Sequence, residues 1–357
     1  MPSDNGNATS TDHSTLKPKT FPVVITRPPL GGGPRIEVLR SWGPGVFRDV
    51  ARSVRSSRKE RILPWRFRAG HPGVTSGLLR GLDIAALRYS YNPFVIPSER
   101  TVQRIGVLAG LTTLRWAVRR VEKGQIGALS VGPNVFILPS EARDELLSSA
   151  VKQILVPSPW VGELYASVLP AIGPKIRVWA VGVDTDKWRP LEPVEPVETR
   201  RCLIYRKNAT EQEVFEVVDL CRRLGWDLAV IEYGRYSSKE YLTALRRADV
   251  LVFLGETESQ GLAMFEAWSA NVPTFVRRWR PHQTAVIADP HQLGDWVGVC
   301  ASPYLSDQTG AFWSSLDELR DLLENSQTLN RHPRQWVLGN ANLELAARTY
   351  YELVMSP

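Results

Sequence analysis

The sequence predicts an α/β protein of two domains, each built on a doubly wound parallel sheet and facing the other across a cleft. From about residue 61 onward, short apolar segments alternate with helical patterns, as they do in parallel sheets that helices cover on both faces. The chain has 357 residues, which is long for one domain and sufficient for two. A stretch rich in proline and glutamate, residues 189–200, interrupts the alternation and indicates a linker.

The same patterns divide the chain into five parts. Residues 1–20 are polar, lack the apolar core of a signal peptide, and are expected to form a disordered tail. The first domain covers residues 21–188 and includes the basic N-terminal segment. The second domain follows the linker and covers residues 201–340. An amphipathic helix at residues 341–357 ends the chain.

Apolar runs predict the strands, and amphipathic runs predict the helices. In the first domain we expect strands at residues 61–67, 105–110, 126–133, 152–158 and 175–183, and helices at residues 78–88, 112–124, 141–151 and 160–169. The loop RAGHPGVTSG joins the first of these strands to the first helix. In the second domain we expect strands at residues 202–207, 227–234, 250–255 and 272–276, and helices at residues 211–225, 239–248 and 261–270.

Positive charge is concentrated near the N-terminus. The net charge is +7, and the segment from Arg27 to Arg68 holds eleven Lys or Arg against three acidic residues, a balance of +8. Residues 46–61 have the spacing of an amphipathic helix with a basic face. Such a helix suits a polyanionic partner, either an anionic membrane surface or nucleic acid. A solvated face without a partner is the third interpretation.

Cysteine usage and hydropathy limit the compartment. Cys202, Cys221 and Cys300 are widely spaced and form no CxxC pattern, which favours a reducing cytoplasm and argues against a structural zinc site. No apolar run reaches the roughly 18 to 20 residues that span a bilayer. We therefore expect a cytoplasmic protein, with peripheral membrane binding as an open alternative. The sequence leaves the oligomeric state open.

The stretch GETESQGLAMFEAWSANVP, residues 255–273, carries the clearest candidate site. A helix is predicted to begin near Gly261, after a strand and a short loop, so unpaired N–H groups and the positive end of the helix dipole are available there. A diphosphate suits such a place, and a glycine lets it approach closely. Glu258 precedes the helix, and Glu266 lies about 7 Å along its axis from Gly261. The two carboxylates can therefore accept hydrogen bonds from sugar hydroxyls on two sides. From spacing alone, an exposed loop residue and a residue favoured by the helix dipole remain the simpler interpretation.

This stretch resembles a known signature. ETESQGLAMFEAWSANVPT is similar to the E-x-F-G-x-x-x-x-E motif of the family 4 glycosyltransferases, which adopt the GT-B fold, and the seven residues between Glu258 and Glu266 match its spacing. ILVPSPWVGELY with KIRVWAVGVDTDKWRP, and SPYLSDQTGAFWSSLDELRDLL, also resemble these enzymes. The resemblance covers about residues 61–350.

The resemblance implies a role for each matching residue of the motif. Glu266 would bind the ribose of the nucleotide, and Glu258 would face the hydroxyls of the donor sugar. The backbone amides of Gln260, Gly261 and Leu262 would contact the sugar and the diphosphate. Gln260 stands where the family carries an aromatic residue.

A basic pair completes the implied donor site. Arg206 and Lys207 follow the first strand of the second domain and match the pair that grips the diphosphate and stabilises it as it leaves. Consecutive side chains of a strand point to opposite faces, so one of the two is expected to reach the phosphates. The resemblance implies no metal and no cofactor, because the helix end and the basic side chains carry the diphosphate charge. Asp184 and Asp186, which could suggest a metal site, match the crossover between the domains instead.

Two histidines are further candidates. His71 lies in the loop RAGHPGVTSG, where the resemblance places the acceptor-facing loop. It is either a catalytic or acceptor-binding residue or an ordinary surface histidine. Ser76, in the same loop, can cap the next helix. His282 follows the motif in RRWRPHQT and is open to the same two interpretations.

We therefore expect a glycosyltransferase that moves a sugar from a nucleotide-sugar donor to an acceptor hydroxyl, with retention of configuration and without a metal. The alternatives are an enzyme that glycosylates a hydroxylated DNA base, a non-catalytic sugar-nucleotide-binding protein of the same fold, and a phosphorylase or sugar-phosphate synthase. The sequence does not identify the sugar, the nucleotide base or the acceptor.

Overall fold

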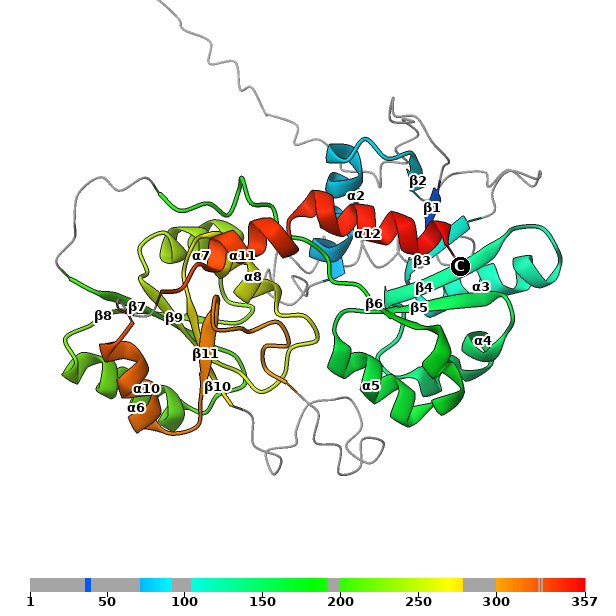
Figure 1. Ribbon diagram of the computed structural model, residues 1–357. Helices are drawn as coiled ribbons and strands as arrows, with labels where there is room; N and C mark the ends of the chain where they lie inside the picture. Colours follow the sequence, from blue (N-terminus) through cyan, green and yellow to red (C-terminus); the bar gives the residue numbers. More distant parts are fainter. Residues whose placement is uncertain are drawn as a thin grey trace, which may run out of the picture.

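A computed structural model of the protein describes residues 36–39, 71–91, 104–191, 199–278, 300–326, 328 and 330–356. Its described strands form two separate sheets, and every strand pair in them is parallel. The sheets lie in two lobes that follow one another along the chain (Figure 1). The predicted fold class, two doubly wound Rossmann-like α/β units, is confirmed.

The first sheet has six strands in the order β2-β1-β3-β4-β5-β6. The strands are β1 Ile36–Leu39, β2 Tyr89–Tyr91, β3 Arg104–Ala109, β4 Ala128–Asn134, β5 Val151–Val156 and β6 Ile176–Val178. Its helices are α2 His71–Ile84, α3 Leu111–Glu122, α4 Arg143–Leu147 and α5 Pro159–Val168, with the 3-10 turns η1 Pro139–Ala142 and η2 Pro170–Lys175.

The second sheet has five strands in the order β11-β10-β9-β7-β8. The strands are β7 Arg201–Arg206, β8 Asp227–Glu232, β9 Val250–Leu254, β10 Thr274–Arg277 and β11 Gly310–Trp313. Its helices are α6 Glu211–Arg223, α7 Ser238–Leu245, α8 Leu262–Ser269, α10 Leu316–Glu324 and α11 Pro333–Asn340, and the chain ends in α12 Leu343–Met355.

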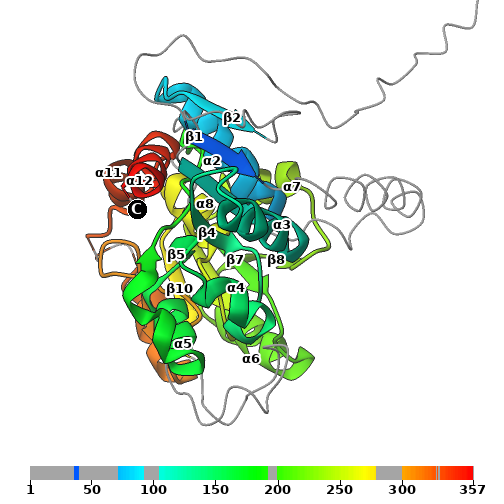
Figure 2. The same ribbon diagram turned by 90° about the vertical axis from the view of Figure 1, so that its right-hand side faces the viewer.

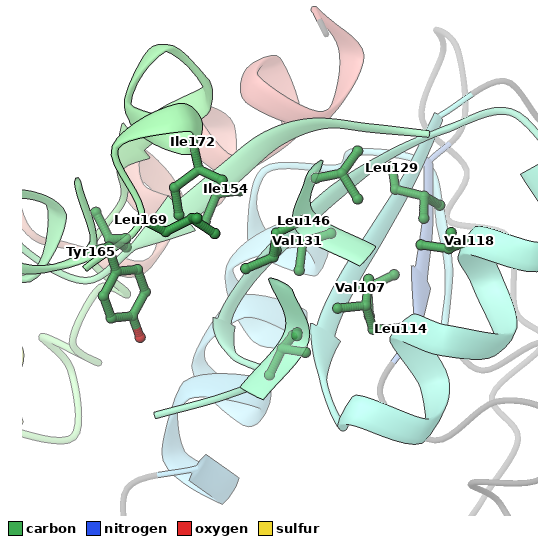
Figure 3. Packing of buried hydrophobic residues seen from close by; sticks show 14 of the residues in the cluster. Val107, Leu114, Val118, Leu129, Val131, Leu146, Ile154, Tyr165, Leu169 and Ile172 are labelled. Carbon is green, nitrogen blue, oxygen red and sulfur yellow. The ribbon is translucent and has the colours of Figure 1, made fainter. Parts of the chain in front are cut away.

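Each sheet is buried between two apolar layers. In the first lobe, β3, β4 and β5 pack against α3, α4 and α5, as Figure 3 shows for Val107, Leu114 and Leu129. Helices α2 and α12 cover the other face through residues such as Leu78 and Tyr350. In the second lobe, α7, α8 and α11 cover one face and α6 and α10 the other. Burial on both faces explains why the central strands are continuous apolar runs.

The last helix returns to the first lobe, where it lies beside α2 in both views (Figures 1 and 2). The chain crosses back where Val183 and Asn342 form a parallel bridge. The indole N–H of Trp179 then donates to the carbonyl of Ala346 at 2.8 Å. Gly81 permits the close approach, since an added Cβ would lie 2.3 Å from a main-chain oxygen of α12.

Two details of the predicted elements are corrected. Helix α2 begins at His71, so most of the predicted loop RAGHPGVTSG is helical. A proline at the second position suits a helix start, and Val74, Leu78 and Leu82 recur at helical spacing on the buried face. The Ser76 hydroxyl therefore donates to the carbonyl of Gly73 at 3.1 Å within the helix instead of capping its start.

The strand predicted for residues 175–183 ends at Val178, because the chain leaves the sheet there for the crossover. The basic segment 46–61, the predicted strand 61–67 and His282 lie outside the described residues. In the part of the chain that the structure describes, every helix falls short of the length and apolar character that a membrane crossing demands.

Candidate functional site

The candidate donor site lies where the strand order of the second sheet reverses. Strand β7 pairs with β8 on one side and with β9 on the other. The loops after β7 and β9 therefore leave the same end of the sheet in opposite directions, which is the usual ligand position in such sheets. They are joined at their base, because the N–H of Lys207 donates to the carbonyl of Leu254 at 2.7 Å.

The loop after β9 ends at Gly261, the residue that precedes α8. Gly261 has φ 88° and ψ 50°, a left-handed conformation that glycine adopts without strain. Its carbonyl accepts from the N–H groups of Met264 and Phe265 at 3.0 and 3.1 Å, which starts the helix. No described side chain caps this start. The first N–H groups of α8 therefore keep their capacity to bind an anion.

Glu266 lies one turn further along α8. The residue is half-buried, and burial raises the pKa of its carboxyl to about 8, while the positive charge of Lys187 offsets part of the rise. Among the described residues, no hydrogen bond or ion pair to the Glu266 carboxyl is found. A carboxylate in this state lacks the partners that normally accompany burial, so a ligand with hydroxyl groups would stabilise its charge.

Three tyrosines surround this part of the site. The Tyr205 and Tyr236 hydroxyls are 2.6 Å apart, and the Tyr241 hydroxyl donates to the carbonyl of Ala263 in α8 at 2.7 Å. Burial raises the pKa of Tyr236 and of Tyr241, and the nearby charge of Glu266 adds to both rises. The tyrosines therefore remain neutral hydrogen-bonding groups beside the carboxylate.

Glu258, in contrast, has a cationic partner. Its Oε1 lies 2.6 Å from the ammonium of Lys207, and both side chains are 16% exposed. The Glu258 N–H donates to the carbonyl of Cys300 at 3.0 Å, and its carbonyl accepts from the indole of Trp160, in the first lobe, at 3.0 Å. The two motif carboxylates thus differ in state, since Glu258 is paired and Glu266 is not.

Arg206 and Lys207 diverge, as the alternation of side chains on a strand requires. The Arg206 Nε donates to the carbonyl of Ala209 at 3.0 Å, and its Nη1 lies 3.9 Å from the Glu211 carboxylate. Lys207 turns toward Glu258. The structure therefore does not bring the side chains of Arg206 and Lys207 together as a joint binding site for a diphosphate.

Gln260 and Leu262 use their side chains for contacts with the first lobe and the crossover. The Gln260 amide makes two hydrogen bonds with Val181, accepting from its N–H at 3.0 Å and donating to its carbonyl at 2.7 Å. Leu262 packs against the cluster that α2 and α12 form. A Cβ added at Gly73 would lie 3.8 Å from its Cδ1, so the start of α2, where His71 lies, is next to the start of α8.

The remaining sequence candidates lie elsewhere. Asp184 forms an ion pair with Arg80 and accepts from the N–H of Lys187 at 3.1 Å. Within the described ranges, no group of three His, Cys, Asp or Glu side chains is arranged to hold a metal. A cavity of about 700 Å³ lies between α7 and the first residues of β7 and β8, away from the strand ends that carry Lys207.

Sequence reasoning missed Tyr236, Tyr241 and Trp160. Tyr236 follows the predicted strand 227–234, so its position at the carboxyl end of a neighbouring strand was a usable signal. Trp160 lies in the first turn of α5, in the other lobe, and only the arrangement of the two lobes brings its indole to Glu258.

No protein-family model and no curated protein matches this sequence. Solved structures do match it. A glycosyltransferase from Rickettsia africae ESF-5 has a TM-score of 0.55 at 11% identity, over 90% of this chain and 97% of that one. The apo form of the lipopolysaccharide outer core galactosyltransferase WaaB has a TM-score of 0.51 at 11% identity, over 90% and 99%. A UDP-forming trehalose-phosphate synthase from Burkholderia xenovorans has a TM-score of 0.51 at 10% identity, over 91% and 99%. Together with the two parallel sheets and their strand orders, these likenesses show that the chain has the GT-B fold.

Proposed function

We propose that the protein is a glycosyltransferase, similar to those of family 4, that transfers a sugar from a nucleotide-sugar donor to an acceptor hydroxyl. Glu266 is the observation that carries the proposal. The residue is half-buried, burial raises the pKa of its carboxyl, the carboxyl has no partner among the described residues, and it lies one turn from an uncapped helix start at the reversal of the strand order. The hydroxyl pair of a ribose, next to a diphosphate, matches these two neighbouring features.

The diphosphate is proposed to lie on the first N–H groups of α8. The helix dipole favours negative charge there, and Gly261 adopts its left-handed conformation without strain. Arg206 is the proposed cationic partner, because its side chain is 27% exposed at the carboxyl end of β7 and the nearest carboxylate among the described residues is 3.9 Å away. The hydroxyls of the sugar would then face Glu258.

In the proposed reaction, the acceptor hydroxyl oxygen forms a bond to the anomeric carbon while the bond from that carbon to the donor phosphate oxygen breaks. Both events take place on one face of the sugar, so the configuration is retained. The hydroxyl proton passes to the departing phosphate oxygen, and the nucleoside diphosphate leaves. We propose that no metal takes part, because the α8 start and Arg206 would balance the charge of the leaving group.

The acceptor is proposed to bind on the first lobe, where the start of α2 with His71 lies next to α8. The basic segment 46–61 would bring a polyanionic partner to the same lobe. The carrier of the acceptor is then either an anionic membrane surface or nucleic acid with a hydroxylated base. Sedimentation with liposomes and a DNA gel shift, each across a salt series, separate these two carriers.

A donor screen tests the proposal first. Thermal shifts with UDP-, GDP- and ADP-glucose identify the nucleotide, and UDP is the natural first choice because one structural neighbour is described as UDP-forming. Calorimetry then compares wild type with Glu266→Ala and with Glu324→Ala, a matched change of an exposed glutamate on α10. At about pH 8.5, where the Glu266 carboxyl is largely ionised, we expect Glu266→Ala to weaken donor binding by about tenfold or more, since a charge-assisted hydrogen bond contributes about 1.5 to 3 kcal/mol. Equal affinity of all three proteins would contradict the ribose assignment.

A further inference from the structure

We propose, building on the donor site above, that Lys207 is a positioning residue that holds Glu258 for the donor sugar, and that it is not a ligand of the diphosphate. The ion pair between the two side chains is the observation that leads to this assignment. It separates two residues that the sequence groups together, because Arg206 and Lys207 then have different roles.

The surroundings of the Lys207 ammonium are already filled. An ammonium has three N–H donors and no acceptor. Glu258 Oε1 lies 2.6 Å from Nζ, the carbonyl oxygen of Thr257 lies 3.4 Å from it, and the ring of Tyr233 lies 4.9 Å away from centroid to Nζ. The ammonium therefore makes two hydrogen bonds within the protein and has an aromatic ring beside it. A phosphate oxygen could bind Lys207 only by displacing one of them.

The main chain holds the pair at both ends. The N–H of Lys207 is bonded to Leu254, the last residue of β9. Glu258 is held through its N–H by Cys300 and through its carbonyl by Trp160 of the first lobe. These bonds fix the backbone positions of both residues, and the Trp160 contact also ties Glu258 to the first lobe.

The pair is suited to a hydroxyl and unsuited to a phosphate. A phosphate that approached Lys207 would also come near the Glu258 carboxylate, which lies 2.6 Å from the Lys207 ammonium, and like charges repel. A sugar hydroxyl carries no charge. Lys207 occupies Oε1 of Glu258, and no contact to Oε2 is found in the described part of the chain, so Oε2 remains to accept a hydroxyl. Lys207 thus determines which oxygen of Glu258 the sugar meets.

The test compares the affinity for a free nucleoside diphosphate with that for its glucose conjugate. The probes are UDP, GDP and ADP with their glucose conjugates, measured by calorimetry on the full chain. The variants are Lys207→Met, Lys207→Arg, Glu258→Gln and the double variant Lys207→Met with Glu258→Gln. Lys239→Met, an exposed lysine on α7, is the matched control.

We expect Lys207→Met to bind the free nucleoside diphosphate within about threefold of wild type but the sugar conjugate about tenfold more weakly. Glu258→Gln should show the same selective loss, and the double variant should lose no more than either single variant, because the two residues act as one unit. Lys207→Arg should recover part of the sugar affinity. The control should match wild type for both probes.

Two results would overturn the assignment. In the first, Lys207→Met lowers the affinity for the free nucleoside diphosphate as much as the affinity for the conjugate, while Glu258→Gln does not. That result identifies Lys207 as a phosphate ligand. In the second, thermal unfolding of wild type, Lys207→Met, Glu258→Gln and their double variant shows additive effects, which means that the pair is not formed. Wild type that binds none of the six probes would refute the proposed function instead, and the unfolding cycle, which needs no ligand, would still decide whether the pair exists.

Discussion

Replacing Glu266 by glutamine is expected to make the protein more stable near neutral pH. Burial raises the pKa of this carboxyl from 4.5 to about 8 in the folded protein. The folded state therefore binds the proton more tightly than the unfolded state, so the stability that the protonated carboxyl contributes is complete below pH 4.5 and is lost as the pH rises through about 8. At about pH 7 the loss is about 3 kcal/mol, at about 1.36 kcal/mol for each pKa unit.

Urea unfolding of both proteins between about pH 5 and about pH 8.5 measures this effect. Glutamine has no titrating proton, so the free energy of unfolding of Glu266→Gln should exceed that of wild type by an amount that grows by about 4 kcal/mol across this range. Groups common to both proteins cancel in the difference. Glu324→Gln, on the exposed face of α10, should show a constant difference near zero. A wild type that is as stable as Glu266→Gln at about pH 8 would refute the assignment of a desolvated, unpartnered carboxyl.

Three further results are expected from the same site. Donor affinity should rise with pH up to about 8, because ribose hydroxyls favour the ionised form of Glu266 and binding therefore releases its proton. Calorimetry in buffers of different ionisation enthalpy measures the number of protons released. Uptake of a proton on binding would contradict this expectation. Gln260→Leu should lower the free energy of unfolding in urea by about 2 kcal/mol or more, because it leaves the N–H and the carbonyl of Val181 without partners. An unchanged urea midpoint would mean that water takes the place of the Gln260 amide. Gly261→Ala should lower the free energy of unfolding by about 1 to 2 kcal/mol, because the residue has a positive φ. Gly339→Ala, in α11 with open space around it, should leave the free energy of unfolding unchanged or raise it slightly. Equal urea midpoints for the two variants would be inconsistent with the left-handed helix start.

The fold class and the start of α8 could be predicted because both depend on local patterns. Apolar runs bounded by turns identify buried strands, and the alternation with helices implies parallel pairing. Gly261 was identified from the sequence because a strand, a short loop and a helical pattern meet there. The start of α2 was misplaced because the glycines in HPGVTSG suggest a loop, whereas Val74 and Leu78 favour a helix only once the cluster they pack against is known.

The states of the two glutamates could not be predicted from their spacing. Lys207 and Glu258 are 51 residues apart, and only the reversal of strand order between β7 and β9 brings their side chains together. The role of Gln260 was hidden for a similar reason, since its partner Val181 belongs to the crossover. Position in a motif therefore indicates where a residue lies, while contacts between distant segments decide its electrostatic state.

The return of α12 to the first lobe affects whether a fragment of the protein can fold. Tyr350 and Val354, close to the last residue, complete the apolar layer over Leu78 and Leu155. A fragment that stops after the first sheet would leave this layer open to water, so we expect it to be unstable on its own even though its strands are contiguous in sequence. During translation, that face stays exposed until α12 has left the ribosome and packed onto it.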